Sequence, residues 1–318
     1  MDTSKAWRFD RYGDPSVMQL VERPRPQPGP GEVLIKVLAA GVNPSDVKNV
    51  SGHFQSTLPR VPGRDFAGVI VGGAREGEEV WGSGPGFGVT RDGVHQEYIT
   101  MPEAWLARRP PGLPAEVAAA AGVPWLAAWS ALITQGKLQA GQTVLVTGIS
   151  GSVGSAATQI AHQLNARVIG VGRSSANPSG ADVVIDTTTQ DLVTEVRALT
   201  ERRGVDLVLD AVGGPMFEPC LRTLCHGGRQ IAIASNPQVV SFNLVDFYHN
   251  SAQLAGVDTM ALSGPEVASI LSQLSEGFAT GRYHTPTIQT WAFEQTIDAY
   301  SAVLAAGQPI KHVLKMFP

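Results

Sequence analysis

The amino-acid sequence predicts an α/β protein with two parts, a β-rich domain and a doubly wound parallel sheet. Three observations predict this fold class. The first hundred residues hold short strand-like runs between Gly and Pro clusters, a Gly-rich turn follows an apolar run near residue 148, and strands alternate with helices from there to about residue 260. The length of 318 residues, at about 150 residues per domain, also indicates two domains.

The first hundred residues favour a small β-barrel or a partly open β domain. Their strand-like runs are Val33–Val37, Gly68–Val71 and Glu97–Met101. The turn-rich clusters between and around them are Pro24–Gly31 and Gly82–Gly88. Many short strands with such connections, and few long helical periods, are typical of β-rich domains.

An apolar run from residue 117 to residue 133 comes between the two parts. Gly122 and Pro124 interrupt this run, and it is shorter than the ~20 residues that a membrane span needs. We therefore expect a buried helical hinge region there and no membrane partner.

The stretch from residue 143 to residue 171 predicts a βαβ unit. Thr143–Thr147 is a short run rich in β-branched residues, as in a buried parallel strand. Ser155–Leu164 places apolar residues on one helical face, and Arg167–Val171 is predicted to be the next strand. Between the first strand and the helix, a glycine recurs every third residue: Gly148, Gly151 and Gly154.

Such a turn suits a phosphate, because the N-terminus of a helix directs backbone N–H groups and the positive end of its dipole at an anion. Glycine is needed because a Cβ atom would hold a pyrophosphate away from the backbone. The alternative is a tight turn that binds nothing. We predict a dinucleotide site made by Thr147, Gly148, Ser150, Gly151, Ser152, Val153 and Gly154.

The end of the second strand predicts which dinucleotide binds. An NAD site usually places Asp or Glu there to bind the ribose 2′-hydroxyl. Here the chain has Gly172, Arg173 and Ser174, and no carboxylate until Asp182. An arginine with hydroxyls suits a 2′-phosphate, so we predict NADPH; the alternative for Arg173 is a solvated surface charge.

Strands and helices continue to alternate beyond this unit, which is the doubly wound pattern. The predicted elements are the strand Asp182–Ile185, the helix Gln190–Thr200, the strand Val205–Asp210, the helix Gly214–Leu224, and the strands Arg229–Ala234 and Leu254–Val257. Past about residue 260, a predicted helix Glu266–Glu276 leads to a strand-rich tail. The strand-rich tail ending VLKMF resembles the N-terminal region, so we expect the chain to return to the first domain. The predicted boundaries are 1–124, 125–260 and 261–318.

Two later turns are predicted to complete the cofactor site, because doubly wound sheets bind ligands at the carboxyl ends of their strands. The residues expected to contribute are Val212, Gly213, Ala234, Ser235 and Asn236. Simple turn chemistry is the alternative. An irregular connection that follows them is a candidate cap for a flat acceptor, through Phe242, Asn243 and Phe247.

Composition and charge narrow the class of protein. The net charge of −4 gives no electrostatic reason to expect nucleic acid or an anionic membrane as a partner, so small molecules are expected. The first ten residues carry charges every few positions, so no signal peptide is expected. Cys220 and Cys225 are expected to be reduced core thiols in a cytoplasmic protein.

Four segments, in the expected order, resemble the medium-chain dehydrogenase/reductase superfamily, and most of all its zinc-independent quinone oxidoreductases, the zeta-crystallin-like branch. The segments are VLAAGVNPSDVKNVSGHF, RVPGRDFAGVIV, TGISGSVGSAATQIA and VDLVLDAVGG. The resemblance implies a GroES-like catalytic domain, a Rossmann domain inserted into it, an active cleft between the two, and a homodimer formed through the cofactor domains.

Zinc is not expected in this chain. Zinc-dependent relatives place Cys where this chain has Asn43, and a His-Glu pair where it has Arg64 and Asp65. A guanidinium cannot coordinate a cation, and an amide is a poor zinc ligand. His53, His95 and His162 are expected to be surface or core residues. Without a Lewis acid, a quinone or an α,β-unsaturated ketone fits best as acceptor, because its oxygen takes up the charge that hydride brings.

The resemblance implies that Asn43–Phe54 is the loop that lines the cleft. Asn43 and Asp46 are expected on its nicotinamide side, and Lys48 and His53 are candidate proton donors. Asp46 also suits the N-terminus of a helix, and Lys48 and His53 also suit solvated positions. Replacing Asn43 or Asp46 is expected to lower turnover with little effect on folding.

The leading prediction is an NADPH-dependent reductase of quinones or enones. The related enoyl-thioester reductases carry a Tyr proton donor where this chain has Phe54, which cannot donate a proton, so acyl thioesters rank second. A protein that binds NADPH without turnover is the third alternative.

Overall fold

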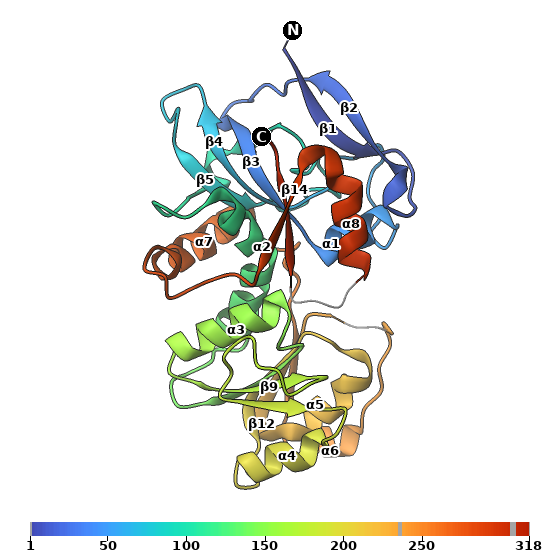
Figure 1. Ribbon diagram of the computed structural model, residues 1–318. Helices are drawn as coiled ribbons and strands as arrows, with labels where there is room; N and C mark the ends of the chain where they lie inside the picture. The colour runs from blue at the N-terminus through green and yellow to red at the C-terminus, as the bar shows by residue number, and fades with distance from the viewer. Residues whose placement is uncertain (1, 235–236, 306–309, 318) are drawn as a thin grey trace. The chain divides into compact units, whose positions relative to one another are not determined.

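The computed structural model describes residues 2–234, 237–305 and 310–317, and the chain divides into two compact units (Figure 1). Unit 1 comprises residues 1–123 and 260–318, and unit 2 comprises residues 124–259. That unit 1 is a catalytic domain and unit 2 a cofactor-binding domain stays a prediction.

Unit 1 is rich in β-structure. Its strands are β1 (Thr3–Phe9), β2 (Met18–Pro24), β3 (Glu32–Val42), β4 (Asp65–Val71), β5 (Glu79–Ser83), β6 (Tyr98–Pro102), β7 (Ala107–Arg108), β14 (Ile288–Ala292) and β15 (Lys311–Lys315). Its helices are α1 (Pro44–Val50), α7 (Gly264–Ala279) and α8 (Thr296–Ala305). A seven-stranded sheet has the order β14-β15-β3-β4-β5-β7 with β6 also paired to β3, while β1 and β2 form a separate antiparallel pair.

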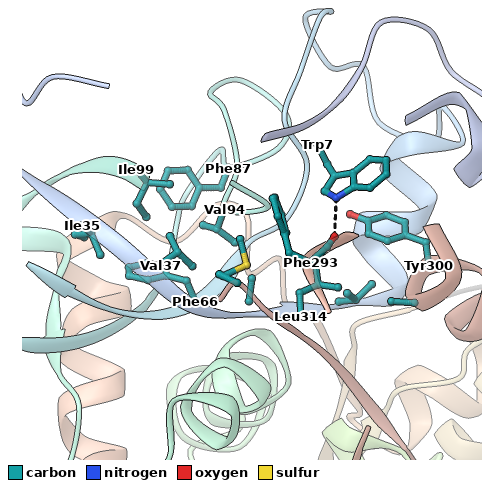
Figure 2. Packing of buried hydrophobic residues seen from close by; sticks show 14 of the residues in the cluster. Trp7, Ile35, Val37, Phe66, Phe87, Val94, Ile99, Phe293, Tyr300 and Leu314 are labelled. Atoms are coloured by element: carbon teal, nitrogen blue, oxygen red, sulfur yellow. Dashed lines mark hydrogen bonds between the residues drawn. The ribbon is translucent and has the colours of Figure 1, made fainter. Parts of the chain in front are cut away.

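The C-terminal segment is part of the sheet of unit 1. β15 pairs antiparallel with β3, so that Val313 lies opposite Gly41, and it pairs parallel with β14. Strand β1 and the C-terminal segment also meet in the core, where the indole Nε1 of Trp7 donates a hydrogen bond of 2.8 Å to the backbone oxygen of Phe293 (Figure 2). Large buried side chains fill this core: Trp7, Ile35, Val37, Phe66, Phe87, Val94, Ile99, Phe293, Tyr300 and Leu314.

Unit 2 is built on a six-stranded parallel sheet. Its strands are β8 (Thr143–Thr147), β9 (Arg167–Gly172), β10 (Val183–Asp186), β11 (Val205–Asp210), β12 (Leu224–Ala232) and β13 (Gln253–Gly256), in the order β10-β9-β8-β11-β12-β13. Its helices are α3 (Ser152–Gln163), α4 (Leu192–Leu199), α5 (Phe217–Thr223) and α6 (Leu244–His249). In Figure 1, α3 lies apart from α4, α5 and α6, which group together.

The apolar run in which a buried helical hinge region was expected is helical. The helix is continuous through Gly122 and Pro124, as α2 (Ala115–Trp129) followed by a π-helical segment (Ser130–Gln135). Pro124 lacks an N–H, and the preceding N–H of Val123 donates to the carboxylate of Asp65 at 2.9 Å. Among the described residues this helix alone is long and apolar enough to cross a membrane, but 72% of its apolar window is buried in the structure.

Other element boundaries differ by a few residues. α3 begins at Ser152 rather than Ser155, with Gly151 as its N-cap, so the helix starts inside the Gly-rich turn. β12 begins at Leu224 rather than Arg229, because the chain passes from the end of α5 directly into extended backbone. The predicted helix over 214–224 is a 3-10 turn (Gly214–Met216) followed by α5.

Candidate functional site

The loop after β3 positions Asn43 and Asp46. Asn43 has extended backbone and is the N-cap of α1, where Pro44 occupies the first helical position. The Asp46 carboxylate accepts a hydrogen bond of 2.8 Å from the backbone N–H of Asn43. Asp46 thus has the helix N-terminal role that was one of its two interpretations.

The Asn43 side chain connects two charged groups in the interior of unit 1. The Lys311 ammonium donates to Oδ1 of Asn43, and Nδ2 of Asn43 donates to Oδ2 of Asp65 at 2.8 Å. Lysine can only donate and an ionised carboxylate can only accept, so these two neighbours fix the orientation of the amide. All three residues are buried.

Asp65 is held where helix α2 approaches the sheet most closely. Its Oδ2 atom also accepts from the N–H of Val123, while Oδ1 is buried and has no hydrogen-bond partner among the described residues. A Cβ on Gly122 would lie 2.3 Å from the Asp65 carboxyl carbon, and a Cβ on Gly41 would lie 2.4 Å from the backbone oxygen of Ala119. These two glycines therefore let the helix and the carboxylate come together.

Burial and charge shift the protonation of this cluster. Burial, followed by the repulsion of Asp65, raises the pKa of Asp46 to about 7, and the nearby charges of Arg64 and Lys311 act in the opposite direction. Burial lowers the pKa of Lys311, whereas Asp65 and Asp46 favour its charged form. Asp46 is therefore a carboxyl group that can keep a proton near neutral pH.

A second hydrogen-bonded chain lies next to the first. The Tyr300 hydroxyl lies 2.9 Å from Nδ1 of His95, and Nε2 of His95 lies 3.2 Å from the backbone oxygen of Gly41. Since a carbonyl only accepts, Nε2 carries the proton and Nδ1 accepts from the tyrosine. Burial lowers the pKa of His95 to about 4, so this histidine is a neutral core residue.

Lys48 and His53 lie apart from these buried chains. Lys48, on α1, and His53, in the loop that follows, are both exposed to solvent. Their roles as proton donors stay predictions. Sequence reasoning missed Lys311 and Tyr300 altogether, although a lysine on the same strand face as the buried Val313 is an available signal.

In unit 2, the turn between β8 and α3 fits a dinucleotide phosphate. Gly148 has a φ of +64°, which favours glycine. A Cβ on Gly154 would lie 2.6 Å from the backbone oxygen of Gly148 and 2.7 Å from Cα of Ile149. The first N–H groups of α3, those of Ser152, Val153 and Gly154, have no acceptor in the preceding turn of the helix. These backbone N–H groups are the ones that would hold the phosphates.

Thr147 connects this turn to the next one in the sheet. Its hydroxyl donates to the Asp210 carboxylate at 2.9 Å and accepts from the N–H of Ala211 at 2.9 Å. Asp210, which is fully buried, also accepts from the N–H groups of Val212 and Gly213. The ends of β8 and β11 are thus held together by one threonine and one carboxylate.

The other predicted cofactor residues lie at strand ends. Gly172 ends β9, and its backbone oxygen accepts from Thr187. Arg173, Ser174, Val212 and Ala234 are exposed. Ser235 and Asn236 lie outside the described residues. For all the residues of this paragraph, contact with a cofactor stays a prediction.

Phe242, Asn243 and Phe247 lie against α5. Phe242 packs between Phe217 and Phe247, with ring centroids 6.0 Å and 5.4 Å apart. Together with residues of α4, α5 and α6, the three line a surface pocket of about 460 Å³. Their expected role as a cap for an acceptor stays a prediction.

The residues of unit 1 do not suit a zinc ion. Asn43 turns its only metal-binding atom, Oδ1, toward the Lys311 ammonium, and the next candidate position is the guanidinium of Arg64. A cation at this point would be repelled by both groups and would find the carboxyl groups of Asp65 and Asp46 in place of a nitrogen and sulfur ligand set. Within the described residues, no group of three or more His, Cys, Asp or Glu side chains could hold a metal ion.

Comparison with known proteins relates both units to characterised domains. Residues 29–111 match the alcohol dehydrogenase GroES-like domain, and residues 152–275 match the zinc-binding dehydrogenase domain. The chain is 35% identical over 292 residues to a zinc-type alcohol dehydrogenase-like protein of Schizosaccharomyces pombe, with 88% of this chain and 87% of that protein covered. It is 27% identical over 314 residues to human quinone oxidoreductase, with 94% of each covered. A mycobacterial protein solved in complex with NADPH has a TM-score of 0.86 and 28% identity, and the match covers 98% of this chain and 100% of that one.

Proposed function

The chain belongs to the medium-chain dehydrogenase/reductase superfamily, and on that premise we propose that it is a zinc-independent reductase that transfers hydride from NADPH to a quinone or an α,β-unsaturated carbonyl compound. The observation that carries this proposal is the Lys311–Asn43–Asp65 chain. Because an organic cation faces Asn43, the acceptor has to be one that takes up hydride without a Lewis acid.

The cofactor part of the proposal is supported by the turn between β8 and α3. The backbone N–H groups of Ser152, Val153 and Gly154 bind the diphosphate, and the guanidinium of Arg173 pairs with the 2′-phosphate. NADPH, when bound, supplies the hydride. The hydrogen bonds of Asp210 with Thr147 and with the backbone of Val212 and Gly213 fix the turn after β11, and this turn would help to hold the cofactor.

Asn43 and Asp46 are proposed to act on the acceptor side. Reduction of a quinone or an enone leaves negative charge on an oxygen, which then needs a proton. Asp46, whose pKa burial and Asp65 raise to about 7, is roughly half protonated near neutral pH and is a buried group that can supply this proton. Lys48 and His53 are the solvent-exposed candidates for the same step.

We further propose that the protein acts as a cytoplasmic homodimer formed through unit 2. β13 is the outermost strand of the six-stranded sheet, and Leu254 on it is 44% exposed. α6 exposes further apolar side chains, Val245 and Tyr248. Sedimentation equilibrium should give a dimer for the native chain and a monomer for Leu254→Lys, while Leu20→Lys, at an exposed position of unit 1, stays dimeric.

The experiment that tests the reaction follows NADPH oxidation with a panel of quinones, enones and acyl thioesters. The proposal expects turnover with quinones or enones, and faster turnover with NADPH than with NADH. Turnover with acyl thioesters alone identifies an enoyl-thioester reductase. Tight NADPH binding without turnover of any acceptor identifies a binding protein and contradicts the proposal.

A further inference from the structure

Lys311 is a buried lysine at the start of a strand that has neighbours on both sides. It is the first residue of β15, which pairs with β14 on one side and with β3 on the other, and the residue is only 4% exposed. Lysine is almost never fully buried unless its charge is paired. The structure therefore has to contain groups that compensate this ammonium.

These groups belong to three elements of unit 1: β3, α1 with its N-cap, and β4. The ammonium donates to Oδ1 of Asn43 and, at 3.3 Å, to the backbone oxygen of Val42. The carboxylates of Asp65 and Asp46 lie close enough to interact with its charge. Since Arg64 is the other buried cation of this cluster, two positive groups balance two carboxyl groups.

We propose that the Lys311 ammonium is the resident cation of this cluster and takes the part that a metal ion would have there, as a positioning residue for Asn43 and the two carboxylates. The inference rests on the proposed function only where it concerns turnover. It explains how Asp46 and Asp65 stay buried close together, because a carboxyl group that ionises in a medium of low dielectric constant needs a positive partner. It also explains the single orientation of the Asn43 amide, through which the cation reaches Asp65.

The alternative role for Lys311 is packing through its aliphatic stem. Lys311→Met keeps most of this stem and removes the charge, so packing alone predicts that the methionine variant behaves like the native protein. If Lys311 acts through its charge as the resident cation, a different result is expected. In Lys311→Met the kcat for quinone reduction falls by about tenfold or more, while the dissociation constant of NADPH is unchanged, because the NADPH site is assigned to unit 2.

The decisive test uses the cofactor-free protein and no substrate, so it stays valid if the proposed reaction is wrong. Lys311→Ala leaves an oxygen-lined space next to Asp65, Asp46 and Asn43, and such a ligand set suits a divalent cation such as Mn²⁺. After dialysis against Mn²⁺, we expect about one ion per chain in Lys311→Ala by elemental analysis and electron paramagnetic resonance. Native protein and Lys315→Ala, which removes an exposed lysine of the same strand, should retain none. A folded Lys311→Ala that binds no more Mn²⁺ than Lys315→Ala overturns the proposal.

A second measurement decides the case in which Lys311→Ala does not fold. If the missing charge is the cause, then neutralising one carboxylate in Lys311→Met/Asp65→Asn should raise the melting temperature or the folded yield above that of Lys311→Met. If the double variant is no more stable than Lys311→Met, the carboxylates do not need the ammonium, and the proposal is wrong.

Discussion

Lys311 donates a hydrogen bond to the Asn43 side chain although the two residues are 268 positions apart in the sequence. The antiparallel pairing of β15 with β3 makes this contact, because it brings the start of the last strand next to the end of β3. The loop that was predicted to carry the chemistry is therefore completed by the C-terminal segment of the chain.

Replacing Asn43 should affect stability as well as turnover. In Asn43→Ala the Lys311 ammonium and the Asp65 carboxylate both lose a buried partner, so we expect a loss of about 3 kcal/mol in the free energy of unfolding. Urea denaturation measures this loss, with Lys48→Ala, at an exposed position on α1, as the unaffected control. The sequence-based expectation of little effect on folding is wrong if this loss is found.

The pH dependence of stability should reveal Asp46. Because its pKa is raised from 3.8 to about 7 in the folded protein, the protonated form is the one that folding favours. This contribution is complete below pH 3.8 and is lost as the pH rises through about 7. Native protein should therefore become less stable relative to Asp46→Asn across this range. The exposed control Asp298→Asn should follow the native curve, and a constant difference between native protein and Asp46→Asn would show that Asp46 ionises normally.

Gly154→Ala should weaken cofactor binding. The new Cβ would lie within 2.8 Å of the backbone of both Gly148 and Ile149, so the turn has to open and its N–H groups move away from the phosphates. We expect the dissociation constant of NADPH to rise by about tenfold or more in fluorescence titration. Gly256→Ala is the control and should bind normally, because its new Cβ would lie 4.0 Å from the backbone oxygen of Ala232, an ordinary contact distance.

Arg173→Ala should remove the preference for NADPH over NADH. Arg173 is exposed at the end of β9, where its charge can pair with a 2′-phosphate but has no partner on a 2′-hydroxyl. The KM for NADPH should rise by about tenfold, and the KM for NADH should stay the same. Arg202→Ala, another exposed arginine of unit 2, should change neither value. An unchanged ratio in Arg173→Ala means that Arg173 is a solvated surface charge.

The predicted fold class is confirmed. It could be predicted from the sequence because its signals are local. The β-branched run of β8, the glycines at its end and the apolar face of α3 all lie within 25 residues, so hydrophobic period and turn chemistry were enough to predict them. The continuity of α2 could not be predicted in this way. The N–H that precedes Pro124, that of Val123, has its acceptor in Asp65, which lies 58 positions earlier in the chain.

The candidate site also combines residues that are close in the sequence with residues that only the fold brings together. Asn43 and Asp46 belong to one short loop, and the sequence pointed to both of them. Lys311 and Tyr300 come from the C-terminal segment, and only the pairing of β15 with β3 and the packing of α8 bring them to that loop. A lysine or tyrosine in a short strand or helix has many ordinary roles, so neither had a signal of comparable strength.

The central claim is that the protein is a zinc-independent reductase. It is tested most directly by following NADPH oxidation by a quinone in the presence of metal-free protein. The protein is treated with a strong chelator, its zinc content is measured by elemental analysis, and the initial rate is followed through the absorbance of NADPH. A zinc-independent reductase gives the same rate before and after chelation and no increase when zinc is added. Loss of turnover on chelation with recovery on addition of zinc would contradict the account, as would the absence of any quinone-dependent NADPH oxidation.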